Sequence, residues 1–285
     1  MEAVTDVVFR HVVERAGAPD VFFTEFANAT GWVHAGDRAI AGRLIKTDDE
    51  YPLVAQIWGG EPGDMEQFAQ HCARLGFAGI DINMGCPVKK VCNVLAGSAL
   101  LQNEKLVAQI LNAVVRAVNV PVTLKTRLGW DDDHQNIPTI AQIAEDAGIA
   151  ALAIHGRTRS QMYRGAAQYD LITAVKQQSR LPIWANGDIT SPQKAAAVLA
   201  QTGADAVMIG RGAQGQPWLF ADIQHYLQHG TLPAPMPFQA ASAIILRHLA
   251  AMHDFYGETA GTRIARKHIG WYLARIPNSQ TARQQ

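Results

Sequence analysis

Short apolar runs alternate with segments of helical periodicity along most of the chain. The apolar runs predict strands over 21–25, 53–57, 79–83, 122–126, 151–155, 183–187 and 206–210. Their nearly continuous apolar character is typical of parallel strands that are covered on both faces. Between them, 64–75 and 104–118 repeat apolar residues at helical spacing, and Ser191-Pro192 has the residues of a helix start. The pattern therefore predicts a repeated β/α unit.

This repeat favours a (β/α)₈ TIM barrel over an open doubly wound sheet. Seven predicted strands are one fewer than a barrel requires, but no G-x-G-x-x-G follows the first of them, as a dinucleotide-binding doubly wound sheet would need. The chain begins with a predicted helix over 6–16, for which Thr5 is the expected N-cap, and no strand precedes it. We therefore expect an α/β TIM barrel whose first strand is missing from this chain.

A linker is predicted near residues 229–237, where HGTLPAPMPF holds three of the 13 prolines. Beyond it, apolar residues recur at helical spacing from Phe238 to Met252, and a last helix is expected over 262–274. The chain thus divides into a predicted barrel domain, 1–229, and a small, incomplete helical domain, 238–285.

Composition narrows the class of protein. The chain has 285 residues, 48% of them hydrophobic, and 25 Lys and Arg balance 25 Asp and Glu. It has no apolar run long enough to span a membrane and no signal-peptide core. Its three cysteines argue against a secreted disulfide framework. We expect a cytoplasmic globular protein. Local basic stretches, such as the one that follows Glu258, favour a polyanionic partner, although most charge runs are only solvated faces.

Polar residues recur where the predicted strands end. The carboxyl ends of barrel strands point into the active-site mouth, so these side chains should converge on one rim. They are Gln56, Asn83, Cys86, Lys125, Arg127, His155, Arg157, Asn186, Asp188 and Arg211. Each alone could be a structural polar group, but their shared position indicates a site.

Two glycine-containing loops, 186–188 and 210–212, follow the last two strands. In barrels the corresponding loops commonly hold a phosphate through backbone N–H groups, and Arg211 could contact phosphate oxygens. Two ordinary tight turns are the alternative. A phosphate site alone does not identify the cofactor.

Cys86 follows a buried strand and is a candidate proton donor, because a free thiol is mostly protonated at neutral pH. Lys89 and Lys90 could lower its pKa. The structural alternative is a small buried cysteine, which is the interpretation that fits Cys72. A metal or disulfide pair of Cys86 with Cys92 lacks further ligands, so no metal site is expected.

Several motifs carry a family resemblance across essentially the whole chain. They are DINMGCPVKKV at 81–91, LAGSALL at 95–101, PVTLKTRLGW at 121–130, IHGRTR at 154–159, ANGDIT at 185–190, DAVMIGRGAQGQPW at 205–218, HDFYG at 253–257 and RIARKH at 263–268. In this order they resemble the tRNA-dihydrouridine synthase family, in its bacterial B-type branch. Members of that family are FMN enzymes that reduce uridine in tRNA.

The resemblance implies roles for individual residues. Cofactor contacts would fall on Met1, Gln56, Lys125, His155, Asn186, Gly187, Asp188, Gly210 and Arg211. Cys86 would be the proton donor, with Asn83, Arg127, Lys125 and His155 near the target uracil. Arg263, Arg266 and Lys267 would share one helix face and hold tRNA phosphates. NADPH or NADH would be the reductant, and the full-length protein is expected to be a monomer.

The implied chemistry adds a hydride from FMN N5 to uracil C6 and a proton from Cys86 to C5. Two other functions stay open. One is an FMN enzyme of free pyrimidines, similar to a dihydroorotate dehydrogenase, which would not need a basic helical appendage. The other is a noncatalytic RNA-binding remnant.

Overall fold

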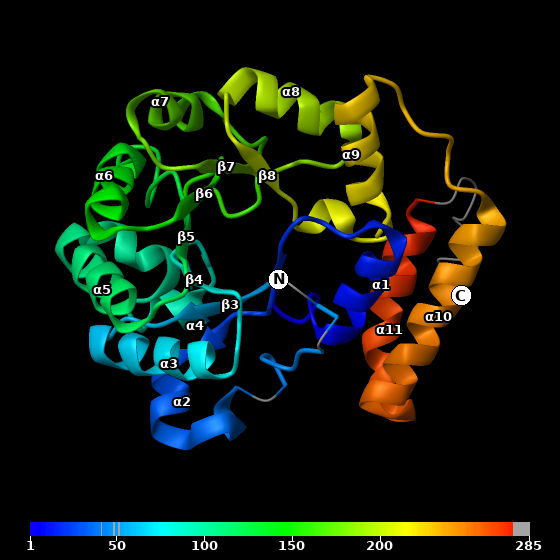
Figure 1. Ribbon diagram of the computed structural model, residues 1–285, viewed down its shortest axis with the longest axis horizontal. Helices are drawn as coiled ribbons and strands as arrows, with labels where there is room; N and C mark the ends of the chain where they lie inside the picture. Colours follow the sequence, from blue (N-terminus) through cyan, green and yellow to red (C-terminus); the bar gives the residue numbers. More distant parts are fainter. Residues whose placement is uncertain (41, 48, 51, 276–285) are drawn as a thin grey trace.

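The computed structural model describes residues 1–40, 42–47, 49–50 and 52–275 (Figure 1). The strands are β1 Phe22–Phe23, β2 Ala27–Asn28, β3 Leu53–Trp58, β4 Gly79–Asn83, β5 Val122–Arg127, β6 Ala151–His155, β7 Ile183–Asn186 and β8 Ala206–Met208. The helices are α1 Val7–Gly17, α2 Ala29–Ala35, α3 Pro62–Arg74, α4 Lys89–Cys92, α5 Glu104–Ala117, α6 Ile137–Ala147, α7 Asp170–Gln178, α8 Pro192–Thr202, α9 Leu219–His229, α10 Phe238–Tyr256 and α11 Glu258–Leu273. Short 3₁₀ turns are η1 Gly36–Ala39, η2 Gly97–Gln102 and η3 Arg211–Ala213.

The strands form one parallel sheet in the order β1-β3-β4-β5-β6-β7-β8, with β2 also paired to β3. Figure 1 shows α3, α5, α6, α7 and α8 arranged around the outside of the strands, as in a TIM barrel. The predicted fold class is therefore confirmed, and the doubly wound alternative is wrong. Within the described residues, β1 and β8 are not paired with each other, so the sheet stays open at this seam.

The first predicted strand, 21–25, is interrupted in the structure. Phe22 pairs with Leu53 but Ala27 pairs with Ile57, so residues 22–27 contain one residue more than the segment of β3 that they face. This is a β-bulge. At the bulge the Thr24 hydroxyl accepts a hydrogen bond from the Gln56 backbone N–H at 3.0 Å, in place of a backbone carbonyl. The sequence pattern did not predict this break.

Helix boundaries follow the sequence with two exceptions. Ser191 caps α8 as predicted, and its hydroxyl accepts from the Lys194 N–H at 3.2 Å. Thr5 is not the cap of α1, so that prediction is wrong. Asp6 takes the position, accepting from the Phe9 N–H at 2.8 Å, while the Thr5 hydroxyl accepts from the amino group of Met1 at 2.6 Å.

The last helix begins at Glu258 and not at residue 262 as predicted. It continues through Gly261, where a Cβ would lie 2.7 Å from the Met252 carbonyl oxygen of α10. The glycine therefore marks a close helix–helix contact, and not the start of the helix.

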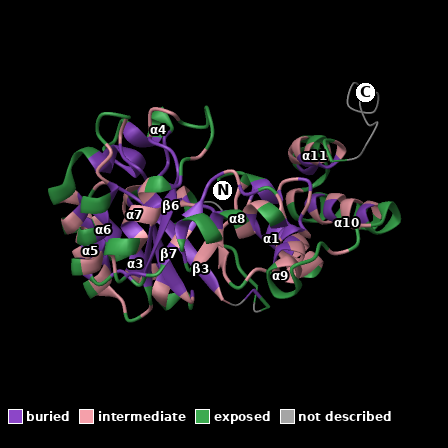
Figure 2. Cartoon of the chain, turned by 90° about the horizontal axis from the view of Figure 1, so that it is seen from above, coloured by how far each residue is buried: buried purple, intermediate pink, exposed green. Residues whose placement is uncertain are grey.

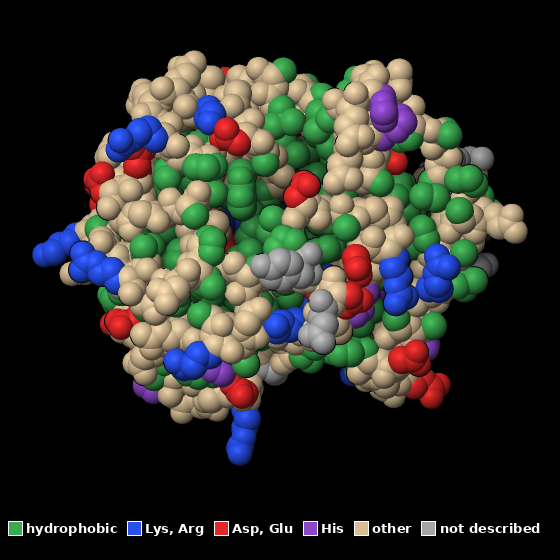
Figure 3. Space-filling model, viewed as in Figure 1, with side chains coloured by type: hydrophobic (Ala, Val, Ile, Leu, Met, Phe, Trp, Pro, Cys, Tyr) green, Lys and Arg blue, Asp and Glu red, His purple; other side chains and the backbone are tan. Residues whose placement is uncertain are grey.

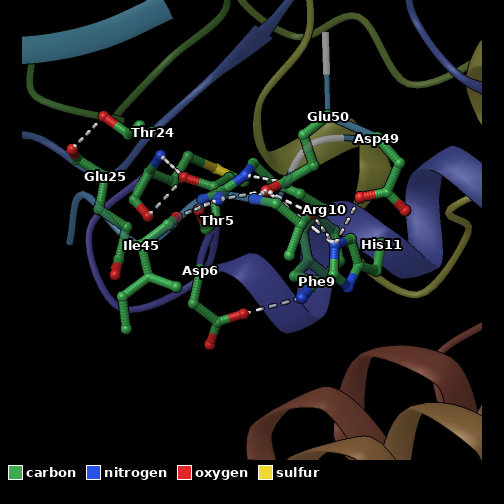
Figure 4. Close-up of polar contacts among 12 residues, drawn as sticks. Thr5, Asp6, Phe9, Arg10, His11, Thr24, Glu25, Ile45, Asp49 and Glu50 are labelled. Atoms are coloured by element: carbon green, nitrogen blue, oxygen red, sulfur yellow. Dashed lines mark hydrogen bonds and ion pairs between the residues drawn. The ribbon is translucent and has the colours of Figure 1, made fainter. Parts of the chain in front are cut away.

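A buried ion pair holds the N-terminal segment in place (Figure 4). Arg10 on α1 donates to both carboxylate oxygens of Glu50, at 2.5 and 3.0 Å, and the two side chains are 2% and 0% exposed. The same guanidinium donates to the carbonyl of Thr5 at 2.9 Å and to that of Ile45 at 2.7 Å. Arg10 therefore joins α1, the chain start and the loop before β3.

Helices α10 and α11 pack on each other and against α1, beside the barrel (Figure 2). Their contact with α1 includes the apolar group Val7, Val8, Met252 and Ala265, and Tyr256 donates to Asp6 at 2.6 Å. The linker after α9 ends where α10 begins, at Phe238. The division into domains 1–229 and 238–285 stays a prediction, and residues 276–285 lie outside the described part. In that part no helix is both long and apolar enough to cross a bilayer.

Candidate active site

A cavity of about 1280 Å³ opens at the carboxyl ends of the strands and continues along the seam between β1 and β8. Every rim residue predicted to bind cofactor or uracil lines it. These are Met1, Gln56, Asn83, Cys86, Lys125, Arg127, His155, Asn186, Gly187, Asp188, Gly210 and Arg211. Toward the seam the lining becomes apolar, with Phe22, Trp184 and Val207. Figure 3 shows apolar side chains around a hollow near the middle of the molecule.

A chain of amide hydrogen bonds connects β3, β4 and the loop that carries Cys86. The Gln56 amide oxygen accepts from the Asn83 amide nitrogen at 3.0 Å. The Asn83 amide oxygen in turn accepts from the backbone N–H groups of Gly85 and Cys86, each at 3.0 Å. Asn83 thus shapes the turn that holds the thiol.

Cys86 is 8% exposed and lies at the cavity wall. Its carbonyl accepts from the Ser98 hydroxyl at 2.9 Å, so the loop is also tethered from the other side. Burial raises the pKa of the Cys86 thiol. Lys89 and Lys90 are exposed, with Lys90 at the cavity, but the pKa of the thiol is raised, so the expectation that they lower it is wrong. A protonated thiol at neutral pH suits a proton donor better than a nucleophile.

Lys125 on β5 donates to the Asn186 amide oxygen at the end of β7, at 3.1 Å. Burial, with the nearby Arg127 charge, lowers the pKa of Lys125 from its ordinary 10.5 to about 8. Burial likewise lowers the pKa of the Met1 amino group to about 6. At neutral pH Lys125 is therefore still mostly protonated, and its ammonium group can donate a hydrogen bond to an oxygen or anionic nitrogen of a ligand.

The lowered pKa of Lys125 predicts how stability changes with pH. Between pH 8 and 10 the unfolded chain binds this proton more tightly than the folded chain, so unfolding becomes harder as pH rises. The free energy of unfolding of the native protein, relative to that of Lys125→Met, should increase by about 2 kcal/mol over this range. Urea titrations of both proteins at each pH measure the difference. Parallel curves would show that Lys125 titrates at its ordinary pKa.

His155 at the end of β6 is 7% exposed and surrounded by cations. Burial, reinforced by Lys125, Arg127, Arg157 and Arg211, lowers the pKa of His155 to about 2. The imidazole is therefore neutral at physiological pH. Arg157 lies 3.3 Å from its Nε2, which as the acceptor leaves the ring proton on Nδ1.

Asp188 follows β7 and is held by neighbours of opposite charge. Both of its oxygens accept from Arg157, at 2.9 and 2.6 Å, and one also accepts from the Ala167 N–H at 2.8 Å. Arg211 lies 3.6 Å away. The carboxylate keeps Arg157 and Arg211 near the loop, and the arginines in turn offset its charge. The sequence places Arg157 at the rim but gives it no role.

Arg127 lines the cavity and also donates hydrogen bonds to backbone carbonyls. It donates to the carbonyls of Gly85 at 2.7 Å, Thr158 at 3.0 Å and Met162 at 2.8 Å. It also lies over the ring of Tyr163, and Arg211 lies over the same ring at 4.4 Å from its centroid. Tyr163 lines the cavity and was missed by the sequence analysis. No signal in the sequence indicates it, because Arg127 and Arg211, which lie over its ring, are distant from it along the chain.

The residues present fit an FMN group. The cavity exceeds the usual 300–1,000 Å³ of small-ligand sites, and its lining supplies an amide, a lysine and a half-exposed arginine, Arg211. At the proposed phosphate end, Gly187 and Gly212 allow close packing. A Cβ would lie 2.8 Å from the Ala167 Cβ in one case and 2.0 Å from the Ile189 carbonyl oxygen in the other. Backbone N–H groups and a cation at that end match a phosphate monoester.

The predicted basic face on α11 is only partly free. Arg263 and Arg266 are exposed, whereas Lys267 donates to the carbonyl of Ala3 and so braces the chain start. None of the three lines the cavity, so a contact that they make with RNA would lie outside it. Among the described residues, no group of three His, Cys, Asp or Glu side chains could hold a metal ion.

Two solved structures share the fold at low sequence identity. The old yellow enzyme homologue from Zymomonas mobilis superimposes with a TM-score of 0.53, at 14% identity, over 84% of this chain and 88% of that one. A dihydroorotate dehydrogenase from Eimeria tenella, in complex with ferulenol, gives 0.51 at 15% identity, over 68% and 64%. Likeness at this identity shows the fold alone.

The family model described as dihydrouridine synthase matches residues 1–285. The tRNA-dihydrouridine synthase B of Pseudomonas aeruginosa is 51% identical over all of this chain and 85% of that protein. The same-named protein of Xanthomonas campestris is 52% identical over 98% of this chain and 83% of its own length. The chain belongs to the dihydrouridine synthase family. This confirms the resemblance carried by the motifs, and with it the expectation of an FMN-dependent oxidoreductase.

Proposed function

We propose that this protein reduces the C5=C6 bond of uridine in tRNA to give 5,6-dihydrouridine. The observation that carries the proposal is the buried, protonated Cys86 thiol, which lines one cavity with Lys125 and the neutral His155. FMN is the cofactor, and NADPH or NADH is the reductant. When bound, FMN supplies the hydride that no side chain can provide.

The cavity residues have three roles in this proposal: stabilising charge, donating a proton and binding the cofactor. Hydride addition at C6 leaves negative charge on the C4 carbonyl, which N–H donors such as Lys125 stabilise. Cys86 then gives its proton to C5. Gln56, Lys125 and His155, with Met1, would hold the ring of FMN. Asn186, Gly187, Asp188, Gly210 and Arg211 would hold its phosphate end. Asn83 and Arg127 complete the wall near the uracil.

A uridine within folded tRNA reaches such a cavity only after leaving its stack. The RNA body must therefore be held elsewhere by its phosphates, and the exposed Arg263 and Arg266 of α11 suit that contact. Lys267 would contribute less, since it already bonds to Ala3. A cytoplasmic location and a monomeric state belong to the same proposal.

The main rival is an enzyme of free pyrimidines, because the dihydroorotate dehydrogenase of Eimeria tenella shares the fold. FMN-loaded protein should oxidise NADPH in the presence of tRNA that lacks dihydrouridine, and mass spectrometry of that tRNA should show a gain of two hydrogens. Free uracil and orotate, whose C5=C6 bonds could also accept the hydride, should give no turnover. Turnover with the free bases alone would support the rival, and none with any substrate would support a noncatalytic RNA-binding protein.

Charge reversal on α11 tests the RNA contact separately. Arg263→Glu with Arg266→Glu should weaken tRNA binding about tenfold or more, since phosphate contacts dominate such affinities. FMN binding should stay unchanged, because neither arginine lines the cavity. Electrophoretic mobility shifts at two salt concentrations measure both the affinity and its salt slope. If the affinity and the salt slope are both unchanged, the RNA binds at another surface of the protein.

A further inference from the structure

A fully buried carboxylate lies beneath the cavity and has no part in the proposed reaction. Asp81, in the middle of β4, is 0% exposed. One of its oxygens accepts from the Thr123 hydroxyl of β5 at 2.6 Å, and the other accepts from the Gln56 amide nitrogen of β3 at 2.7 Å. Burying a carboxylate raises the free energy of the folded state unless hydrogen bonds replace those lost to water. The hydrogen bonds of Asp81 are therefore expected to have a structural role.

The hydrogen bonds around Asp81 continue directly to the thiol loop. From Asp81 the order is the Gln56 amide, the Asn83 amide, and then the backbone N–H groups of Gly85 and Cys86. Each amide side chain has one donating and one accepting end. Turning either of them over would therefore place two donors or two acceptors face to face.

The groups at the two ends of this hydrogen-bond chain fix the same orientation for both amide side chains. The Asp81 carboxylate, with its pKa raised only to about 6 by burial, is an acceptor at neutral pH, so the Gln56 nitrogen must face it. At the other end, backbone N–H groups can only donate, so the Asn83 oxygen must face them. The two constraints meet at the Gln56–Asn83 hydrogen bond of 3.0 Å, which satisfies both.

We propose that Asp81 is a positioning residue: it fixes the Gln56 amide, and through Gln56 and Asn83 it holds the loop that presents Cys86. The same contact sets the orientation of the Gln56 amide, which lines the cavity, so Asp81 also acts on the flavin site. The role depends on the proposed function only in giving Cys86 and Gln56 their tasks. The hydrogen-bond chain itself belongs to the protein without ligand.

The test measures how readily Cys86 is alkylated, which needs no turnover. Iodoacetamide is added to the full-length protein, both FMN-free and FMN-loaded, and the alkylation of each cysteine is followed by peptide mass spectrometry. Asp81→Ala should raise the rate at Cys86 about five- to tenfold, because losing hydrogen bonds of about 1 kcal/mol each lets the loop open more often. Cys72, 0% exposed on α3, is the internal standard for general loosening and should not change.

Three further variants separate positioning from simple stabilisation. Gln56→Leu breaks the chain in the middle and should raise Cys86 alkylation as Asp81→Ala does. Asp81→Asn still accepts from Gln56 and can donate to Thr123, so it should stay within about twofold of the native rate. Thr123→Val removes the other hydrogen bond of Asp81 and should also leave Cys86 unchanged, which makes it the matched control.

FMN affinity gives the second readout, by quenching of flavin fluorescence. Asp81→Ala should weaken FMN binding about tenfold, and Asp81→Asn should restore most of the affinity. The proposal is overturned if Cys86 alkylation in Gln56→Leu equals the native rate, if Cys72 accelerates in parallel with Cys86, or if Asp81→Asn behaves as Asp81→Ala does. If Asp81→Ala does not fold, Gln56→Leu decides. Lack of tRNA reduction by the native protein would refute the proposed function and leave this result intact.

Discussion

Replacing Cys86 with alanine should lower the rate of tRNA reduction by a factor of about 10² to 10⁴, the range that general acid catalysis contributes. The thiol is buried at the cavity wall and its pKa is raised, so the native enzyme has the proton in place at neutral pH. Without it the proton must come from water. FMN binding should change little, because alanine keeps the loop and removes one sulfur atom.

Single-turnover oxidation of the reduced flavin by tRNA measures this effect, with the dihydrouridine content of the RNA as the product assay. Cys92→Ala is the matched control. Its sulfur lies 3.7 Å from the Cys86 carbonyl oxygen and 3.6 Å from the Ser98 hydroxyl, so it shares the loop but does not line the cavity. Native rates in Cys86→Ala would remove the thiol from the mechanism. An equal loss in Cys92→Ala would attribute the effect to loop structure.

Glu50→Ala should cost about 3–5 kcal/mol of folding free energy, the largest stability effect we expect from one substitution. The change leaves the Arg10 guanidinium, 2% exposed, without its carboxylate partner. Two carbonyls still accept from Arg10, but they cannot offset a full charge in a buried site. Urea denaturation followed by circular dichroism measures the loss.

Two comparison variants isolate the buried charge. Arg180→Met breaks the Arg180–Glu145 pair, whose arginine side chain is 89% exposed, and should cost much less, because a solvated ion pair contributes little to stability. The double variant Arg10→Met with Glu50→Leu removes both charges and should recover most of the stability lost in Glu50→Ala. A double variant as unstable as Glu50→Ala would mean that packing, and not the unpaired charge, causes the loss.

The fold and the residues that line the cavity were predictable, because both depend on the order of strands and helices along the chain. Once apolar runs and helices alternate, parallel pairing places every strand's carboxyl end on one rim. Gln56, Lys125 and His155 could therefore be grouped although they are far apart in sequence, and the structure brings them into one cavity. Their chemical roles stay predictions.

Details that depend on neighbours in space were not predictable. The bulge between β1 and β2 exists only in relation to the register of β3. Thr5 and Asp6 are both N-cap residues by type. In the structure Asp6 caps the helix, and the Thr5 hydroxyl accepts instead from the Met1 amino group. The sequence likewise cannot show that Arg127 donates to three backbone carbonyls.

The sequence holds one further signal, in the strand that carries Asp81. The segment 79–83 reads Gly-Ile-Asp-Ile-Asn, so it places an aspartate inside a strand that the same pattern predicts to be buried on both faces. A carboxylate in such a place must have hydrogen-bond donors on the neighbouring strands. Asp81 could thus have been identified as the centre of a polar network before its partners were known.

The loop after β7 has its shape before any ligand arrives. Asp188 holds a left-handed backbone conformation, with φ of 52°, and its carboxylate is fixed by Arg157 and the Ala167 N–H. An anion that binds beside it meets donors already in position, so little conformational entropy is lost on association. The conformational entropy of this loop is lost during folding and not on binding, so the affinity for a phosphorylated ligand is higher.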